Sequence, residues 1–330
     1  MTDSSKMLTL LQHAVGEKTV CEQESMKKHT TFRIGGPADL FAMPTTLEEV
    51  CQIVRICREQ EYPFYVIGNG SNLLVPDAGY RGLVLQLYKN FSRIEVNDKA
   101  VCVSENEDSD HSFQGGSSLK EDPESCVITA QAGAMLSVIA KRALEAGLTG
   151  FEFASGIPGT LGGAVVMNAG AYGGEMKQVL VSATVLTREG EVREIPVSGL
   201  ELGYRKSAVL PNGWIVLGAR LALRKGNPDE IRTRMDELKE QRVSKQPLDL
   251  PSAGSTFKRP EGYFAGKLIM DAGLKGYTVG GAQVSEKHCG FVVNRGGATA
   301  ADVLQLIADV TERVKTRFGV TLEPEIRILM

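Results

Sequence analysis

The sequence has few of the features that identify a membrane or secreted protein. Its 330 residues include one tryptophan and only 6% aromatic residues, and no apolar run approaches the roughly 18 residues that a bilayer-spanning helix requires. Residues 1–16 lack a basic start followed by an apolar block, so no secretion signal is expected. We therefore expect no membrane insertion and predict a cytoplasmic protein.

Net charge and metal ligands are also scarce. The formal charge of −3 creates no protein-wide field that would gather nucleic acid or an acidic membrane surface, so no nucleic-acid partner is expected. An anionic ligand would have to be held by a local cluster of residues. The four histidines are too widely spaced for a metal-site motif, and we expect no metal: His13, His29, His111 and His288.

The six cysteines form no Cys-x-x-Cys pair. They are Cys21, Cys51, Cys57, Cys102, Cys126 and Cys289. We interpret them as reduced, buried thiols of a cytosolic protein, because cysteine packs as a small apolar residue where no disulfide forms. Cys51 and Cys57 fall within a helical pattern and are expected to be small core residues.

Length and composition indicate a globular protein of two or three domains. At about 100–200 residues per domain, 330 residues are enough for this number. Apolar residues make up 42% and charged residues 23%, values that are ordinary for a chain with a real core. We place a boundary near residues 225–227, with a front part at 1–225 that has halves of about 1–88 and 89–225, and a back part at 226–330.

Capping signals and periodicity predict the regular elements. Helices are expected at 46–60, where Thr46 and Glu49 form a capping box, at 136–146 before Gly147, at 228–242 after Asn227, and from Thr299 to Gly319. Strands are expected at 64–67, 82–87, 96–103, 126–131, 179–187, 192–196 and 322–329.

Residues 104–125 form an acidic segment between two of these strands. Seven acidic residues stand against the single Lys120, and only Phe113 and Leu119 are large and apolar. Such a segment cannot bury enough apolar surface to offset the entropy lost on ordering. We predict a mobile, solvated insert that takes no part in activity.

The first candidate site is a glycine-rich loop that follows the strand at 64–67. It comprises Gly68, Asn69, Gly70, Ser71, Asn72 and Leu73. Glycines permit positive φ, and successive backbone N–H groups in such a turn form a concave site for phosphate. A plain turn remains the alternative. No helix follows the loop, so it does not match a Rossmann fingerprint.

The second candidate site has seven glycines between Gly156 and Gly174. This is too many for an ordinary helix, because each interior glycine costs about 1 kcal/mol relative to alanine. A tight packing crossover is one explanation, and a large planar or diphosphate ligand pressed against the backbone is the one we favour. The candidate residues are Gly156, Ile157, Pro158, Gly159, Thr160, Gly162, Gly163, Asn168, Gly170 and Ala171, with Gly133 upstream.

Three polar motifs follow farther along the chain. They are Tyr-Arg-Lys-Ser at 204–207, a small-residue turn at 251–258 that holds Ser255, and Leu-Glu-Pro-Glu-Ile-Arg at 322–327. Taken one at a time, each has an ordinary explanation: a surface ion pair, a turn, or a solvated strand end.

Taken together, and with Thr-Phe-Arg-Ile-Gly-Gly-Pro-Ala at 31–38, these motifs occur in the order found in the UDP-N-acetylenolpyruvoylglucosamine reductases. The chain resembles this family from about residue 25 to its C-terminus. The resemblance implies an α+β fold. A two-subdomain FAD-binding domain of the PCMH type, as in vanillyl-alcohol oxidase, would span residues 1–225, and a C-terminal α/β substrate domain would span 226–330.

The resemblance also implies the chemistry. FAD would be bound non-covalently at the two glycine-rich sites and reduced by NADPH, and hydride would pass to the enolpyruvyl ether of UDP-N-acetylglucosamine enolpyruvate, a step of peptidoglycan synthesis. Ser255 would donate a proton, while Arg205 and Glu325 would hold and polarise the enolpyruvyl carboxylate. A fixed guanidinium suits an enolate-like charge. Contacts to UDP are implied for Tyr204, Lys245, Arg259, Lys267, Lys275 and Gln283.

The residues leave two other functions open. One is an FAD oxidase or dehydrogenase with the same flavin domain that acts on an alcohol or hydroxy acid. Many such enzymes tether flavin through a histidine, which neither glycine loop contains. The other is a flavin- or nucleotide-binding protein without catalysis. The chain has no room between Tyr204 and Lys245 for the tyrosine-bearing loop of the longer family subclass, so the shorter subclass is predicted.

Overall fold

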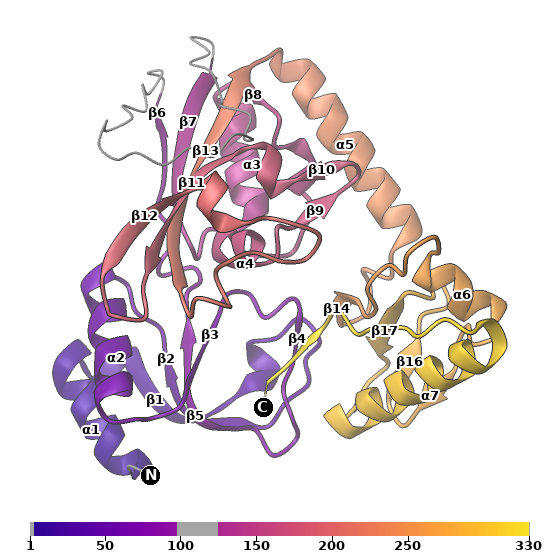
Figure 1. Ribbon diagram of the computed structural model, residues 1–330, viewed down its shortest axis with the longest axis horizontal. Coiled ribbons are helices and arrows are strands. Elements are labelled where there is room, and N and C mark those ends of the chain that lie inside the picture. The colour runs from indigo at the N-terminus through magenta and orange to yellow at the C-terminus, as the bar shows by residue number, and fades with distance from the viewer. Residues whose placement is uncertain (1–2, 98–124, 330) are drawn as a thin grey trace, which may run out of the picture. The chain divides into compact units, whose positions relative to one another are not determined.

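The computed structural model describes residues 3–97 and 125–329, so residues 104–124 of the predicted acidic insert lie outside the described residues. The chain divides into two compact units, shown in Figure 1. The first combines Met1–Leu87 with Glu240–Met330, and the second is the continuous stretch Tyr88–Lys239. The domain boundaries inferred from the sequence stay a prediction.

The N-terminal part of the first unit is a mixed four-stranded sheet with helices packed beside it (Figure 1). Its elements are α1 (Ser4–Val15), β1 (Val20–Ser25), β2 (Pro37–Ala42), α2 (Leu47–Glu59), β3 (Phe64–Ile67), β4 (Leu73–Leu74) and β5 (Tyr80–Gln86). The sheet order is β1-β2-β5-β3, with β1 antiparallel to β2 and both β2 and β3 parallel to β5. The capping box of Thr46 and Glu49 is present, which confirms the predicted start of α2.

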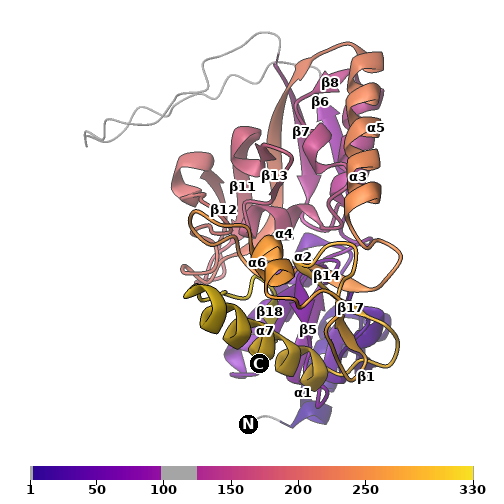
Figure 2. The same cartoon turned by 90° about the vertical axis from the view of Figure 1, so that its right-hand side faces the viewer.

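The C-terminal part of the first unit is an antiparallel sheet with α7 beside β15 and β16, in orange to yellow in Figure 2. Its elements are β14 (Ser252–Ser255), α6 (Ala265–Asp271), β15 (Thr278–Val279), β16 (Ala282–Val284), β17 (Phe291–Asn294), α7 (Ala300–Phe318) and β18 (Arg327–Ile328). Thr299 caps α7 and Gly319 ends it at φ +71°, as predicted. The apolar face of α7 is buried and includes Val303, Leu306 and Val310.

The predicted final strand at 322–329 is wrong in its length. Only Arg327–Ile328 forms a strand, and it pairs in parallel with β4. The residues before it form backbone hydrogen bonds with another segment. The Lys258 amide donates to the Glu323 carbonyl, and the Glu325 amide donates to the Thr256 carbonyl, both at 2.8 Å. Pro324 between them has no N–H to continue a ladder.

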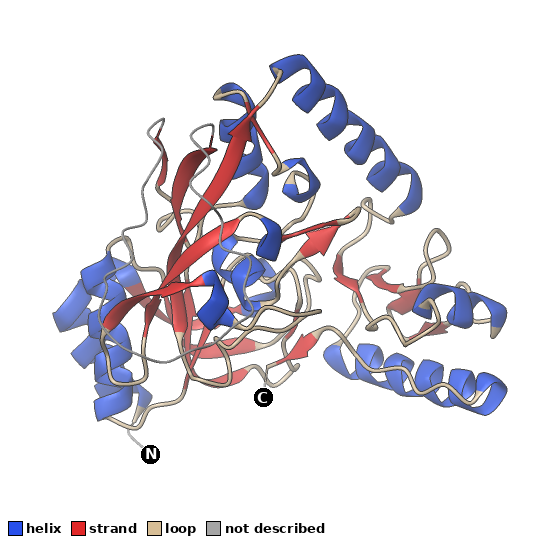
Figure 3. Cartoon of the chain, turned by 45° about the horizontal axis from the view of Figure 1, so that its top comes forward, coloured by secondary structure: helices blue, strands red, loops and turns tan. Residues whose placement is uncertain are grey.

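The second unit is built on the sheet β12-β11-β13-β7-β6, whose strands are red in Figure 3. Its elements are β6 (Ile94–Asn97), β7 (Ser125–Gln131), α3 (Leu136–Glu145), β8 (Leu148–Thr149), α4 (Leu161–Val166), β9 (Gly170–Ala171), β10 (Gly174–Glu175), β11 (Leu180–Leu186), β12 (Val192–Pro196) and β13 (Ile215–Lys225). Helix α5 (Pro228–Lys245) begins in this unit, and its residues from Glu240 onward belong to the first unit. The predicted strands at 179–187 and 192–196 are present as β11 and β12, which pair antiparallel, and the predicted helix before Gly147 is confirmed. Helix α5 continues three residues beyond its predicted end.

Two expectations about individual residues are corrected. A six-residue helix, α4, forms at Leu161–Val166 despite its two glycines. Gly162 is tolerated there because the helix packs closely on β7, so that a Cβ at Gly162 would lie 2.9 Å from the Cβ of Ala132. Of the described cysteines, Cys57, Cys126 and Cys289 are buried, but Cys21 is exposed and Cys51 half-buried. No helix in the described part of the chain combines the length and apolar character needed to cross a bilayer.

Candidate active site

The loop at Gly68–Leu73 is held from both flanks within the first unit. It leaves β3 and enters β4 without a helix, as predicted. Gln86 on β5 donates from Nε2 to the Gly68 carbonyl at 2.9 Å, and the Thr31 amide donates to the Gly70 carbonyl at 3.3 Å. Gly70 has φ +60°, and a Cβ there would lie 2.1 Å from the His29 carbonyl oxygen. This glycine is therefore required by packing as well as by its turn.

The end of the same loop lies beside the C-terminal segment. Asn72 donates from Nδ2 to the Glu325 carbonyl at 3.2 Å, and the Arg327 amide donates back to the Asn72 carbonyl at 2.9 Å. Strands β4 and β18 continue this contact as a parallel pair (Figure 1). The loop Gly68–Leu73 and the segment that carries Glu325 are thus joined by backbone and side-chain hydrogen bonds.

Ser255 lies at the end of β14, and its neighbour Thr256 bonds to the segment that carries Glu325. The predicted small-residue turn is in fact a strand whose pairing with β17 is irregular around Gly254, which has φ +76°. The Thr256 hydroxyl accepts from the Val292 amide at 3.0 Å, and its carbonyl accepts from the Glu325 amide at 2.8 Å. The structure therefore brings the segments of Ser255 and Glu325 together. Ser255 is exposed and Glu325 half-buried.

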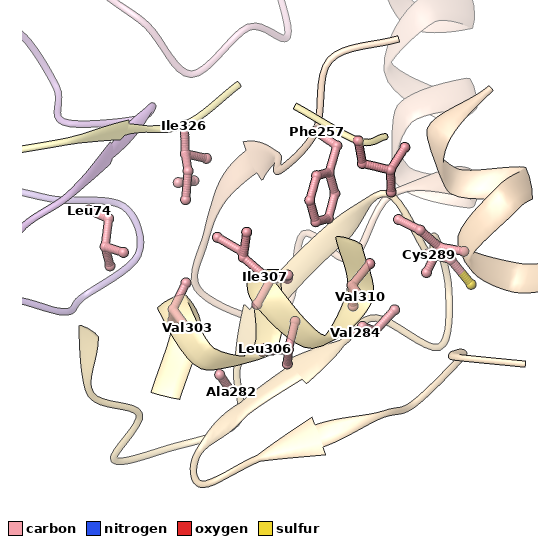
Figure 4. Close-up of a cluster of buried hydrophobic side chains, with 14 of the residues drawn as sticks. Leu74, Phe257, Ala282, Val284, Cys289, Val303, Leu306, Ile307, Val310 and Ile326 are labelled. Atoms are coloured by element: carbon pink, nitrogen blue, oxygen red, sulfur yellow. The ribbon is translucent and has the colours of Figure 1, made fainter. Parts of the chain in front are cut away.

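One hydrophobic cluster lies beneath these segments (Figure 4). It contains Leu74 on β4 after the glycine-rich loop, Phe257 near Ser255 and Ile326 next to Glu325, together with the apolar face of α7. Close-packed side chains resist displacement, so three motifs that are distant in sequence share a rigid base.

In the second unit, Asn168 connects the second glycine-rich segment to the Tyr-Arg-Lys-Ser turn. Its side chain is 2% exposed and its φ is +41°. Nδ2 donates to Glu175 Oε2 at 2.9 Å and to the Gly203 carbonyl at 3.2 Å, while Oδ1 accepts from the Lys177 amide at 2.9 Å. Asn168 therefore braces the backbone on which both motifs depend.

Arg205 occupies a strained position in that turn. Gly203 and Lys206 exchange backbone hydrogen bonds at 3.1 and 3.2 Å, so Tyr204 and Arg205 are the two central residues. Arg205 has φ +55°, which glycine or asparagine normally supplies at this turn position. Its Nε atom is shielded from solvent, and its guanidinium carbon lies 5.4 Å from the centroid of the exposed Tyr204 ring. A non-glycine residue keeps this conformation only where the surrounding structure holds it there.

The second glycine-rich segment contains two kinds of glycine. A Cβ at Gly133 would lie 2.2 Å from the Tyr88 carbonyl oxygen, and one at Gly170 would lie 2.6 Å from that of Gly174, so these glycines serve close packing. Gly163 differs, because it is exposed on α4 and a Cβ there would meet nothing closer than Thr160 Oγ1 at 3.8 Å. Internal packing gives no reason for a glycine at Gly163. An open glycine face fits the close approach of a flat or diphosphate ligand, as FAD requires.

The residues predicted to contact UDP lie at or near the surface. Arg259 lies 4.0 Å from the Phe264 ring centroid, Lys267 pairs with Asp271 at 2.7 Å, and Gln283 donates to the Gly276 carbonyl at 3.3 Å. Lys245, at the end of α5, and Lys275 are exposed. Their contacts with UDP stay a prediction, as does that of Tyr204.

Two supporting residues were missed by reasoning from the sequence. Asp77 accepts from the amides of Ala300 and Ala301 at 2.8 and 3.0 Å, so it caps α7 from the loop after β4. His29 contacts Gln86, which holds the Gly68 carbonyl. The partners lie 57 to 224 residues away, and no local pattern signals them.

Known proteins share this sequence and fold. Residues 246–329 match the family model of the UDP-N-acetylenolpyruvoylglucosamine reductase C-terminal domain. Residues 38–105 and 111–196 match the family model of an FAD binding domain. The UDP-N-acetylenolpyruvoylglucosamine reductase of Agathobacter rectalis is 56% identical over 93% of both chains. This chain belongs to the UDP-N-acetylenolpyruvoylglucosamine reductase family. The reductase of Lachnoclostridium phytofermentans is 50% identical over 98% of this chain and 97% of its own.

A crystal structure of the Thermus caldophilus reductase matches the fold. The TM-score is 0.73 at 35% identity, over 94% of this chain and 98% of that one. The resemblance and the α+β flavin-domain fold predicted from the sequence are therefore confirmed. In this chain the match to the FAD-binding domain lies in the front part, and the match to the reductases' C-terminal domain lies in the back part.

Proposed function

We propose that this protein is an FAD-dependent reductase that converts UDP-N-acetylglucosamine enolpyruvate into UDP-N-acetylmuramate for peptidoglycan synthesis, with NADPH as the reductant. The observation that carries this conclusion is the 56% identity to a reductase of that name over 93% of both chains. An oxidase with the same flavin domain is disfavoured, because residues 246–329 match the C-terminal domain of the reductases.

FAD, when bound, carries a hydride from NADPH to the substrate. Loop Gly68–Leu73 and the segment Gly156–Ala171 are the proposed contacts. Binding is non-covalent in this proposal, since neither segment contains a histidine. The hydrogen bonds to the Gly68 and Gly70 carbonyls orient the first loop, and the open face at Gly163 admits a close approach to the second.

Three side chains have proposed roles in the reduction. Arg205 binds the enolpyruvyl carboxylate and stabilises the charge that develops when hydride arrives. Glu325 polarises the same group, as a hydrogen-bonded partner in an anion clamp. Ser255 donates a proton to the carbon adjacent to the one that receives hydride. A hydroxyl is a weak acid, so it depends on fixed placement, which the bonds of Thr256 support.

Substrate recognition and location complete the proposal. Tyr204, Lys245, Arg259, Lys267, Lys275 and Gln283 are the proposed contacts to UDP. We place the enzyme in the cytoplasm. Membrane insertion and nucleic-acid binding form no part of the proposed function.

The test is an absorption spectrum of the purified protein, followed by addition of NADPH with and without UDP-N-acetylglucosamine enolpyruvate. A yellow protein whose flavin is bleached by NADPH and reoxidised by the enolpyruvyl substrate without oxygen is expected. Denaturation should release the flavin into solution. Reoxidation by oxygen alone, with no response to the substrate, would instead indicate an oxidase.

A further inference from the structure

The turn that carries Arg205 is attached at both ends to the segment in which α4 ends. Before Arg205, the Gly203 carbonyl accepts from Asn168 Nδ2 at 3.2 Å. After Arg205, the Ser207 hydroxyl donates to the Val166 carbonyl at 2.8 Å. The side chains that make these bonds are buried, with Asn168 2% and Ser207 8% exposed. Two buried side chains therefore attach the turn on either side of Arg205.

The hydrogen bonds of Asn168 use its side-chain amide almost completely. The Gly203 carbonyl can only accept and the Lys177 amide can only donate, so Nδ2 faces the first and Oδ1 the second. The other hydrogen of Nδ2 serves Glu175 Oε2, which lies 2.9 Å away. Both donors are thus used within the protein, and the side chain has none left to offer FAD.

The carbonyl that Asn168 holds is also the one that closes the turn. The Gly203 carbonyl accepts a second bond, from the Lys206 amide at 3.2 Å, and Arg205 lies between the two bonded residues. Arg205 has φ +55°, a conformation that costs about 1–2 kcal/mol for a residue with a Cβ. Without its attachments the turn could relieve this cost by rotating its backbone, which would move the guanidinium.

We propose that Asn168 and Ser207 are positioning residues of the reductase: they hold the turn so that Arg205 meets the enolpyruvyl carboxylate. The inference rests on the proposed role of Arg205, which acts when reduced flavin delivers hydride to the substrate. Reduction of the flavin by NADPH involves no enolpyruvyl carboxylate. Loss of either attachment should therefore slow only the second half-reaction, and a displacement of about 1 Å is enough for a 10²-fold loss.

The substitutions Asn168→Asp and Glu175→Gln, made together, test this role on the holoenzyme. The carboxylate at position 168 still accepts from the Lys177 amide, and the amide at position 175 supplies the donor between the two side chains. Only the Gly203 carbonyl loses its donor. By stopped-flow absorbance, reoxidation of the flavin by the enolpyruvyl substrate is expected to slow about 10²-fold. The rate of bleaching by NADPH and the FAD dissociation constant should stay near the wild type.

Ser207 provides an independent pair of variants if the double variant does not fold. Ser207→Ala removes the second attachment and should slow the same step, whereas Ser207→Thr keeps the hydroxyl and should recover much of the rate. Asn212→Asp is the matched control, because Asn212 Nδ2 also donates to a backbone carbonyl, that of Ala208 at 2.8 Å, which lies outside the turn. This variant should follow the wild type.

Hydrogen exchange of the Lys206 amide gives a readout besides activity. Its acceptor is the Gly203 carbonyl, so exchange should be about fivefold faster in the double variant, as for the loss of one hydrogen bond of ordinary net strength. Unchanged exchange, or reoxidation at the wild-type rate in the double variant or in Ser207→Ala, would overturn the proposal.

The remaining outcomes separate this proposal from other roles. Equal slowing of both half-reactions with a lower Tm would show a merely structural role for Asn168, and weaker FAD binding would show a flavin contact, so either result would also overturn the proposal. Normal reoxidation in Arg205→Gly, or a wild-type flavin that the enolpyruvyl substrate does not reoxidise, would refute the proposed function instead. The exchange rates would still decide whether Asn168 holds the turn.

Discussion

Asn72 donates a hydrogen bond from its side-chain amide to the backbone carbonyl of Glu325, across 253 residues of sequence. The Arg327 amide returns a bond to the Asn72 carbonyl at 2.9 Å. One asparagine therefore fixes the proposed flavin-binding loop against the backbone of a proposed catalytic residue. A shift of the loop would therefore also shift the backbone of Glu325.

Replacing Asn72 should weaken both the fold and the site. Asn72→Ala removes the donor to a half-buried carbonyl, so we expect the free energy of unfolding to fall by about 1–2 kcal/mol. FAD affinity should fall as well, because the loop loses a support. Urea denaturation and flavin titration measure the two effects. Asn90→Ala, at an exposed turn position, should change stability by no more than about 0.5 kcal/mol. An equal loss of stability in the two variants would argue against a supporting role for the Asn72 side chain.

Ser255→Ala should separate the two half-reactions. Reduction of the flavin by NADPH needs no proton from this side chain, so bleaching should proceed near the wild-type rate. Reoxidation by the enolpyruvyl substrate should slow by about 10²–10⁴-fold, the range for loss of a positioned general acid. Stopped-flow absorbance resolves the two steps. Ser255→Cys should recover part of the second, and Ser252→Ala on the same strand is the control. Equal slowing of both steps in Ser255→Ala would reject the proton-donor role.

Arg205 and Glu201 allow strain to be separated from function. Both have positive φ, at +55° and +47°. Glycine relieves about 1 kcal/mol of strain at each, partly offset by the added entropy of the unfolded chain. Arg205→Gly and Glu201→Gly should therefore both keep a Tm close to the wild type. Only Arg205→Gly should lose kcat, by about 10²–10³-fold, as for loss of a preorganised donor. A destabilised but active Arg205→Gly would show a structural role.

The cysteines should differ sharply in reactivity. Burial raises the pKa of the Cys57 thiol to about 12, and its side chain is fully buried. The thiolate is the reactive form, so raising the pH from 7 to 9 should leave Cys57 unlabelled by iodoacetamide. Partial burial and Glu24 also raise the pKa of Cys21, but this thiol is exposed and should label faster as the pH rises. Mass spectrometry after timed quenching distinguishes the sites. Cys57 labelling at the rate of Cys21 would contradict the burial.

The sequence by itself determined several local elements and the family to which the chain belongs. The capping box at Thr46 and Glu49 and the stop at Gly319 depend on residues within a few positions, so their signals are complete in the local sequence. The order of six motifs was likewise sufficient to indicate the reductase family. The final strand was predicted too long because the pairing of residues 323–325 with 256–258 has no local signal.

Only the tertiary structure decided which residues hold the motifs in place. Asp77 caps α7 from a distant loop, and Gln86 fixes the Gly68 carbonyl from the neighbouring strand. It also separated glycines required by packing, such as Gly70, from the open Gly163. Each distinction depends on which atoms approach from elsewhere in the chain. These atoms are brought close together when the apolar faces of distant elements pack against each other. Many different sequences can form such a packed core, so no short sequence pattern reveals which residues will meet.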